Sequence, residues 1–455
     1  MPSKVDGRIT AVSITDNPGG SPALSPDILG LEILNSGMNV IVHFTCRDTN
    51  RMGMNNILAL TGDYSGKGSG GKGTPVFDFN SVVLTTMFKD LNRRLIKPGH
   101  SSIFITGCAV SPFKYTEAET CVQYRKLERK TEAGASPRSP SPSSAATSTS
   151  IRNCCCSRRP KRSISRRLPP SITSTIDRRN RSMPAGCPAS SSPTGCSTRS
   201  CRNGRIRPQA GNTPSSAPPV WAWSRKASAN GIYLGGIHDG YDTVGQILDR
   251  MHAIEPNWQE YNEEFQEDKP NRFYLYTKPE SAGEAAQEER IKMKITDNCH
   301  YMLLKTAHDL FFDKDASLAP VYKRISSSLD RNKKSWVLKR FLEDPFKKML
   351  LSCQSCGDCG IQHVGFPCPE SGCPKHTRNG PCGGSHNGDC EVNKDQLCVW
   401  ARAHERMKKH GETVKLTGEF VPPRQWELKD TSSWINFHPD RDHQKSKVRM
   451  KAKAL

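Results

Sequence analysis

The stretch VIVHFTCRDTN (residues 40–50), followed by RMGMNNILALTGD (51–63) and YSGKGSGGKG (64–73), decides the fold class of this chain. Its two apolar runs, residues 40–46 and 57–60, are rich in β-branched residues, and each ends in polar residues. A strand buried inside a parallel sheet has this pattern and delivers side chains to a functional edge. We therefore expect four polar residues at that edge: His43, Arg47, Asp48 and Asp63.

The segments around this stretch predict an α/β fold. Residues 8–15 are typical of a strand, and residues 26–35 of a helix that Ser25 caps and Pro26 begins. Together with residues 40–46 they form a βαβ unit, which implies a parallel sheet. Further on we expect a helix at 81–96, a strand at 102–108 and a basic amphipathic helix at 121–133. Residues 47–56 are shorter than the dozen residues of a usual parallel crossover, so a helix is expected to be missing there.

The net charge of +21 comes mainly from one segment. Residues 135–228 hold 17 Lys and Arg against one acid, Asp177, and are otherwise rich in Ser and Pro. Such a composition buries too little apolar surface to fold, so we expect disorder. The triplet Cys154-Cys155-Cys156 also fits leucine codons read in a shifted frame, which would make the segment a reading-frame artefact; a basic linker is the alternative. Because the charge is not on a folded face, a nucleic-acid partner is unlikely on these grounds.

The chain's 35% hydrophobic and 24% charged residues are ordinary for a soluble protein. The sequence contains neither a membrane span nor the apolar core of a signal peptide, so we expect no membrane partner and a cytoplasmic location. In that compartment, clustered cysteines indicate metal rather than disulfides.

A cysteine cluster near the C-terminus is the most specific motif. Its spacing is C-x2-C-x2-C-x8-C-x4-C-x8-C-x7-C-x7-C, formed by Cys353, Cys356, Cys359, Cys368, Cys373, Cys382, Cys390 and Cys398. Eight thiolates suffice for two four-ligand sites, either iron–sulfur clusters or tetrahedral zinc. His363, His376 and His386 are expected to be loop residues, with replacement of a thiolate as the alternative.

Other polar residues have two interpretations each. Residues 66–72 fit the phosphate-loop pattern G-x4-G-K, but Gly73 replaces the Ser or Thr that would bind Mg²⁺, so a mobile loop is the better interpretation. His43 suits either a core or an active-site edge, and Asp63 suits either a site or a helix cap. The cations of residues 121–133 would, on their own, form a solvated face.

Six segments together resemble the methylenetetrahydrofolate reductases. In order they are ITAVSITDNPGG (9–20), VHFTCRD (42–48), NILALTGD (56–63), ITGCAVSPFKYTEAE (105–119), LERKTEAGA (127–135) and GIYLGGIHD (231–239). They are similar to barrel strands two to five, the helix after strand five, and strand eight. The cysteine region resembles the domain appended to long bacterial forms.

The resemblance implies a (β/α)8 TIM barrel that holds FAD and reduces 5,10-methylenetetrahydrofolate to 5-methyltetrahydrofolate, as in methionine biosynthesis. Electrons would come from NAD(P)H or ferredoxin. The implied catalytic residue is Asp63, which would tune the flavin and engage the folate. The implied cofactor-binding residues are Thr15, His43, Thr61, Gly62, Asp63, Gln123, Lys126, Arg129 and Lys130.

Some parts of the family's barrel have no counterpart in this sequence. The family's general-acid glutamate on strand one is absent, and strands six and seven would fall within residues 135–228. We therefore expect an incomplete barrel and an inactive chain.

The resulting domain prediction has five segments. They are barrel strands two to five (1–134), the Ser/Arg/Pro-rich segment (135–228), the end of the barrel with strand eight (229–280), a helical connector (281–350) and a mostly helical or irregular cysteine-rich metal-binding domain (351–445). Possible partners are a folate substrate, a second copy of the chain or a redox protein. The alternatives are a basic nucleic-acid-binding protein and a stand-alone electron-transfer module.

Overall fold

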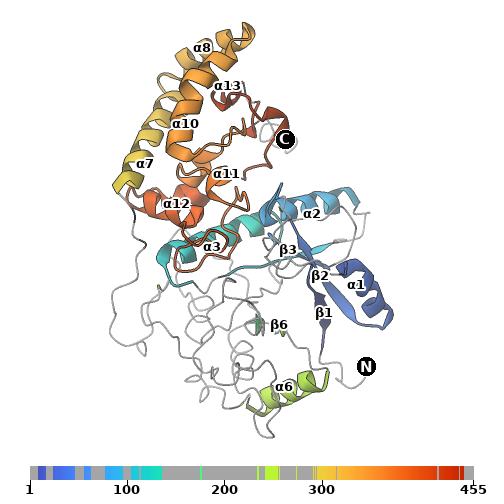
Figure 1. Ribbon diagram of the computed structural model, residues 1–455. Coiled ribbons are helices and arrows are strands. Elements are labelled where there is room, and N and C mark those ends of the chain that lie inside the picture. Colours follow the sequence, from blue (N-terminus) through green and yellow to red (C-terminus); the bar gives the residue numbers. More distant parts are fainter. Residues whose placement is uncertain are drawn as a thin grey trace, which may run out of the picture.

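The computed structural model of the chain describes residues 9–16, 24–46, 56–62, 77–95, 104–111, 114–135, 175–176, 233–234, 241–254, 256, 273, 291, 293, 295–313, 315–417, 420–439 and 441–444. We refer to residues 9–135 as the α/β part and to residues 295–444 as the C-terminal part (Figure 1). No helix within these ranges has both the length and the apolar character that crossing a bilayer requires.

A parallel sheet of four strands forms the centre of the α/β part. Its strands are β1 (Ala11–Ile14), β2 (Asn39–Thr45), β3 (Asn56–Leu60) and β4 (Ile105–Cys108), and they lie side by side in chain order. Ile14 pairs with Val42, and Thr45 with Leu60. The predicted α/β class is confirmed. This order differs from a doubly wound sheet, in which the strand order reverses, and it is the order of consecutive strands in a βα barrel.

Three helices accompany the sheet: α1 (Pro26–Asn35), α2 (Ser81–Leu95) and α3 (Glu117–Glu132). The bounds of α1 and α2 match the prediction to within one residue. The predicted start of α3 was four residues too late, because Thr116 caps the helix in partnership with Glu119. The Thr116 hydroxyl accepts the Glu119 backbone N–H at 3.3 Å and donates to the Glu119 carboxylate at 2.8 Å. This reciprocal pair is a capping box, which fixes where a helix begins.

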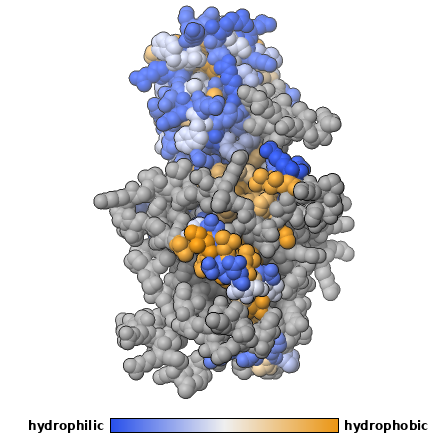
Figure 2. Space-filling model, turned by 90° about the vertical axis from the view of Figure 1, so that its right-hand side faces the viewer, coloured by the Kyte–Doolittle hydropathy of each residue, from blue (hydrophilic) through white to orange (hydrophobic). Residues whose placement is uncertain are grey.

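Helix α1 packs on the sheet through only one of its faces. Gly30 lies against Val40 and Val42, where its missing side chain allows close approach. On the other side Leu31 and Leu34 are 60% and 52% exposed. Figure 2, which views the molecule from the side of α1, shows hydrophobic residues gathered on this face. An exposed hydrophobic patch of this kind marks a surface that another element usually covers.

Three elements lie between the two parts in sequence: β5 (Thr175–Ile176), β6 (Tyr233–Leu234) and α6 (Tyr241–Ile254). Strands β5 and β6 pair with each other in parallel. Helix α6 follows the segment GIYLGGIHD (231–239) in the chain. Of residues 271–278, only Phe273 falls within the described residues. Most of residues 135–228 also lie outside them, so disorder there stays a prediction.

The C-terminal part is helical at both ends and irregular around the cysteines. Its elements are α7 (Ile295–Ala307), η7 (His308–Phe312), α8 (Ala319–Arg331), α9 (Ser335–Leu338), η8 (Lys339–Glu343), α10 (Asp344–Leu351), η9 (Ile361–Val364), α11 (Pro369–Gly372), α12 (Val399–Lys408), η10 (Thr413–Thr417), η11 (Trp426–Leu428) and α13 (Ser433–Phe437). The helical character predicted for residues 310–351 is confirmed.

Helix α3 belongs to the hydrophobic core of the C-terminal part. Its Val122 packs in one buried cluster with Tyr301, Trp400 and Met407. Figure 1 shows α3 lying between the sheet and the helices of the C-terminal part. The two parts are therefore joined by a shared apolar core, and α3 is the element that both of them use.

Candidate functional site

The first four cysteines of the cluster surround one small cavity. This cavity, of about 20 Å³, is lined by Cys353, Cys356, Cys359 and Cys368 together with other residues. Burial, with a smaller contribution from the neighbouring Cys359, raises the pKa of Cys353 to about 11 and of Cys356 to about 12. Burial likewise raises the pKa of Cys368, where Cys359 again contributes. We call these residues the first thiol set.

A buried lysine lies beside the first thiol set. Lys347 of α10 is 3% exposed and donates to the Glu343 carboxylate at 3.0 Å and to the Ser433 hydroxyl at 2.5 Å. Burial lowers the pKa of Lys347, but the neighbouring Cys359, Glu343 and Cys353 raise it well above its ordinary value, so the ammonium keeps its proton. A fixed positive charge at this place stabilises negative charge on the thiols.

The loop between Cys356 and Cys359 requires a glycine at position 357. Its φ of +71° is left-handed, and a Cβ added there would lie 1.8 Å from the Leu428 carbonyl oxygen. Any side chain would therefore force the loop and the segment around Leu428 apart.

We expect Gly357→Ala to destabilise the C-terminal part by roughly 2–4 kcal/mol, since it combines a left-handed backbone with a backbone clash. Gly360→Ala is the matched control, because a Cβ there meets its nearest atoms at 4.0 Å. Thermal unfolding of the two variants measures the difference. Equal melting temperatures for the two would contradict the packing of Leu428 on this loop.

The last four cysteines form a second thiol set: Cys373, Cys382, Cys390 and Cys398. Burial raises the pKa of Cys373, and the neighbouring Cys390 raises it further. Burial raises the pKa of Cys398 to about 12, with contributions from Cys373 and Cys390. The pKa of Cys382 is also raised by burial, and Cys373 and Cys398 are among its neighbours. No disulfide joins cysteines in the part of the chain that the structure describes.

Lys375 connects the second thiol set to the sheet. Its ammonium donates to the Glu391 carboxylate at 2.5 Å and to the backbone oxygen of Gly62, just after β3, at 2.8 Å. The Cys382 thiol donates to the same Glu391 carboxylate at 3.3 Å. A chain of three contacts therefore runs from a thiol to the carboxyl edge of the sheet.

Of the four polar residues predicted for the sheet edge, only His43 is described, and it lies within β2, two residues before the end of the strand. His43 is 5% exposed, and its Nε2 lies 2.6 Å from the Ser13 hydroxyl on β1. Thr15 directly follows β1. Thr61 follows β3 and is buried, with its hydroxyl 3.4 Å from that of Ser81. Arg47, Asp48, Asp63 and the glycine loop at 65–74 lie outside the described residues.

The four predicted residues of α3 are buried, so they do not form a solvated face. Gln123, Lys126, Arg129 and Lys130 are each 3–5% exposed. Lys126 donates to the Pro381 oxygen at 2.6 Å, Arg129 to the Leu416 oxygen at 2.8 Å, and Lys130 to the Ala109 oxygen at 2.6 Å. The solvated-face interpretation was wrong because the C-terminal part covers this side of the helix.

This buried face carries cationic side chains whose hydrogen bonds go to backbone oxygens. Glu132 is an electrostatic neighbour of Arg129. Among the described residues the amide nitrogen of Gln123 and two guanidinium nitrogens of Arg129 have no hydrogen-bond acceptor. Burial, together with the charge of Lys130, lowers the pKa of Lys126 to about 7. Burial also lowers the pKa of Arg129 to about 10. Buried donors of this kind fit an anionic ligand.

The three histidines near the cysteines have other neighbours. His363 Nε2 lies 2.9 Å from His443 Nε2, His376 Nδ1 lies 3.3 Å from the Glu370 carboxylate, and the ring of His386 packs edge-on against Tyr115. These contacts agree with their interpretation as loop residues.

Sequence reasoning missed several residues around these sites. Asp16 follows β1 and accepts from the Thr45 hydroxyl at 2.6 Å, and Asp358 sits between two cysteines with no exposed surface. An acid flanked by cysteines, as in CGDCG (356–360), was a usable signal for Asp358.

Lys347 pairs with Glu343 beside the first thiol set, and Lys375 pairs with Glu391 beside the second. The spacing of Glu343 and Lys347, four residues apart, was also a usable signal. Lys375 gave none, because its partners Gly62 and Glu391 are distant in sequence.

The comparisons with known proteins concern the C-terminal part. A family model described as "Methylene-tetrahydrofolate reductase C terminal" matches residues 337–427, a range that includes all eight cysteines of the two thiol sets. The chain matches no curated protein and no solved structure. Residues 337–427 are therefore similar to the C-terminal region of methylene-tetrahydrofolate reductases.

Proposed function

We propose that this chain descends from the flavin-dependent reductases of 5,10-methylenetetrahydrofolate, that its C-terminal part is a metal-binding domain, and that the chain itself is inactive. The observation that carries the proposal is the grouping of eight cysteines, of which the first four line one cavity and the last four are electrostatic neighbours of one another. Four thiolates make a complete site for zinc or for an iron–sulfur cluster. The whole arrangement lies in a region similar to the C-terminal region of this reductase family.

The first thiol set can take zinc or an iron–sulfur cluster. Its four cysteines line a common cavity, and four thiolates are the ligands of both kinds of centre. The four thiols would bind as thiolates, and Lys347 would stabilise their negative charge. We leave zinc or iron–sulfur open for each set.

We assign the phosphates of FAD to the buried face of α3, which the loop around Pro381 and the segment near Leu416 would have to uncover. Unpartnered donors of Gln123 and Arg129, with two neighbouring lysines, supply the charge that a diphosphate needs. When bound, the flavin supplies hydride-transfer chemistry. Lys126, Arg129 and Lys130 would hold its phosphates, while His43, Thr61 and Gly62 at the sheet edge would face its ring. Asp63 is proposed to engage the folate.

The second thiol set lies beside this face. Lys126 has Cys382 as an electrostatic neighbour and bonds the adjacent Pro381. A redox-active centre in this set would be well placed to exchange electrons with a flavin held by α3. NAD(P)H or ferredoxin is proposed as the donor of the ancestral reaction.

The test is the composition of the full-length chain after anaerobic purification. We expect FAD at about one per chain and two metal centres, measured by elemental analysis and visible absorption. Zinc in both sets gives two zinc and no metal colour; a cluster in either set gives about four iron atoms and a brown colour. Reduction of methylenetetrahydrofolate with a reduced dye as donor then tests turnover, and we expect none. A chain that binds neither metal nor FAD, or one that turns over, would refute the proposal.

We further expect Lys126→Met to have opposite effects on stability and on FAD affinity. Because burial lowers the pKa of Lys126 from 10.5 to about 7, the unfolded chain binds more protons between these values. Relative to the variant, the flavin-free parent should therefore gain stability with pH across this window, a comparison in which the raised pKa values of the thiols cancel. The variant should be more stable below pH 7 by roughly 1–3 kcal/mol, and bind FAD at least tenfold more weakly.

Urea unfolding at several pH values and FAD titration measure the two effects. Lys89→Met is the control, because Lys89 lies on α2 and its ammonium donates only to the backbone oxygen of Glu132 in an exposed bond. A stability difference between parent and variant that stays constant between pH 7 and 10 would show that burial does not lower the pKa of Lys126.

A further inference from the structure

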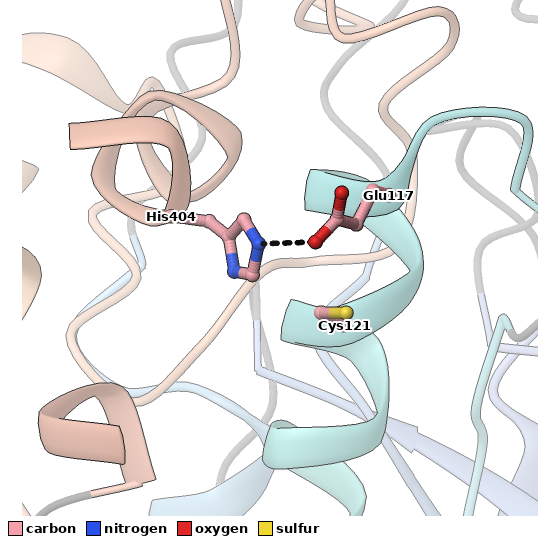
Figure 3. A group of neighbouring side chains, drawn as sticks. All are labelled: Glu117, Cys121 and His404. Carbon is pink, nitrogen blue, oxygen red and sulfur yellow. Dashed lines mark ion pairs between the residues drawn. The ribbon is translucent and has the colours of Figure 1, made fainter. Parts of the chain in front are cut away.

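Three potential metal ligands from two helices meet outside the two thiol sets. Glu117 and Cys121 lie one turn apart on α3, so they share a face of the helix, and His404 approaches from α12 (Figure 3). A carboxylate oxygen, the thiol sulfur and a ring nitrogen all lie within 4.8 Å of one another. None of the three residues belongs to the cysteine motif or to the flavin face.

His404 is the residue that points to a ligand. It is 3% exposed, and neither of its ring nitrogens has a hydrogen-bond partner. Leaving a buried imidazole unsatisfied is costly, so a missing partner is a reasonable inference. Its Nε2 lies 3.7 Å from Glu117 Oε1, which is too far for a hydrogen bond.

That separation suits two ligands of one ion. Nitrogen and oxygen ligands about 2.0–2.2 Å from a zinc ion, at a tetrahedral angle, lie roughly 3.3–3.6 Å apart. Small side-chain movements would therefore bring Nε2 and Oε1 to a common ion. The other carboxylate oxygen, Oε2, accepts from Lys408 of α12, and this contact orients Oε1 toward His404.

The surrounding charges allow a divalent cation. Glu117 and Glu405 raise the pKa of the Cys121 thiol in addition to burial, whereas Arg125 and Lys408 lower it. Lys408 is 38% exposed in its side chain, so water screens its charge. A metal would bind the Cys121 thiolate directly, and metal binding displaces the thiol proton.

We propose that Glu117, Cys121 and His404 form a third metal site, which takes a zinc-like divalent ion and fastens α3 to α12. One thiolate, one imidazole and one carboxylate are ligands that zinc accepts, and three protein ligands leave a fourth position for water. The ion would join the two parts of the chain at the helix that both share. This site does not depend on the proposed reductase ancestry.

The test counts metal in the full-length chain and its variants. After purification with zinc, Cys121→Ser and His404→Gln should each carry one equivalent of divalent metal fewer than the parent, whatever fills the thiol sets. Cys299→Ser and His410→Gln are the controls, since Cys299 is exposed and His410 instead stacks on Tyr301. Both should keep the parent's metal content. Unchanged metal in the site variants would overturn the proposal and leave a Glu117–His404 ion pair only.

A second measurement avoids variants that fail to fold. The parent, with its two thiol sets already filled, is titrated with Co²⁺. One further tight equivalent, with the absorption of a single thiolate ligand, supports the site. No further binding, or binding without a thiolate band, overturns it. Absence of reductase activity or of FAD would change neither readout.

Discussion

Cys368→Ser is expected to remove one metal centre from the chain and to leave the second intact. Cys368 lies in the first thiol set, so its loss breaks that site while the four thiols of the second set keep theirs. Structural zinc sites supply roughly 10–16 kcal/mol of binding free energy, so residues around the broken site should unfold locally. Metal analysis and hydrogen exchange of residues 353–370 measure the two consequences.

Combining variants tests how the cysteines are assigned. Cys359→Ser with Cys368→Ser should lose no more metal than either alone, because both belong to one site. Cys368→Ser with Cys398→Ser should lose both centres, because Cys398 belongs to the second set. Cys46→Ser is the control, since that thiol is buried against the Leu60 oxygen, far from the cluster in sequence. If the cross-set pair lost only one centre, the division into two sets would be wrong.

The α/β part could be predicted because the sequence signals for its helices and strands lie within or next to those elements. Ser25 and Pro26 mark the start of α1, and the β-branched run at 40–46 marks β2. The parallel pairing of consecutive strands follows from the βαβ order. The start of α3 was also readable, since Thr116 and Glu119 are three residues apart, but this capping box was overlooked.

The burial of the α3 cations could not be predicted in this way. Locally, Lys126 and Lys130 belong to a charged helix that would usually face water. What buries them is the loop around Pro381 and the segment near Leu416, more than 250 residues further along the chain. Gly380 permits this contact, because a Cβ at its φ of +114° would lie 2.8 Å from the Lys126 side chain.

The cysteine spacing predicted eight ligands but not which of them share a site. The structure groups the first four and the last four in chain order. Asp358 and Arg378 connect the loops that carry them, and their pairing joins residues twenty positions apart. Whether metal occupies the two sets stays a prediction.

Arg378→Met is expected to destabilise the C-terminal part by about 3–5 kcal/mol, since it leaves two buried carboxylates without their cation. The Arg378 guanidinium is 5% exposed in its side chain and donates to Asp358 at 2.9 Å and to Glu370 at 3.0 Å. Asp358 also accepts from His443 Nδ1 at 2.6 Å, so the ion pair holds the loop of the first thiol set against the end of the C-terminal part.

Local stability is measured by hydrogen exchange of residues 356–379 in the full-length chain, where the opening free energy is read directly. Arg441→Met is the matched control: it removes a guanidinium from Asp330 in an exposed pair, which should cost about 0–1 kcal/mol. Arg424→Met should lie between the two, because it removes one contact to Glu370 and leaves Arg378 in place. An Arg378 variant that opens no more readily than the Arg441 variant would mean that this buried network does not hold the cysteine loops together.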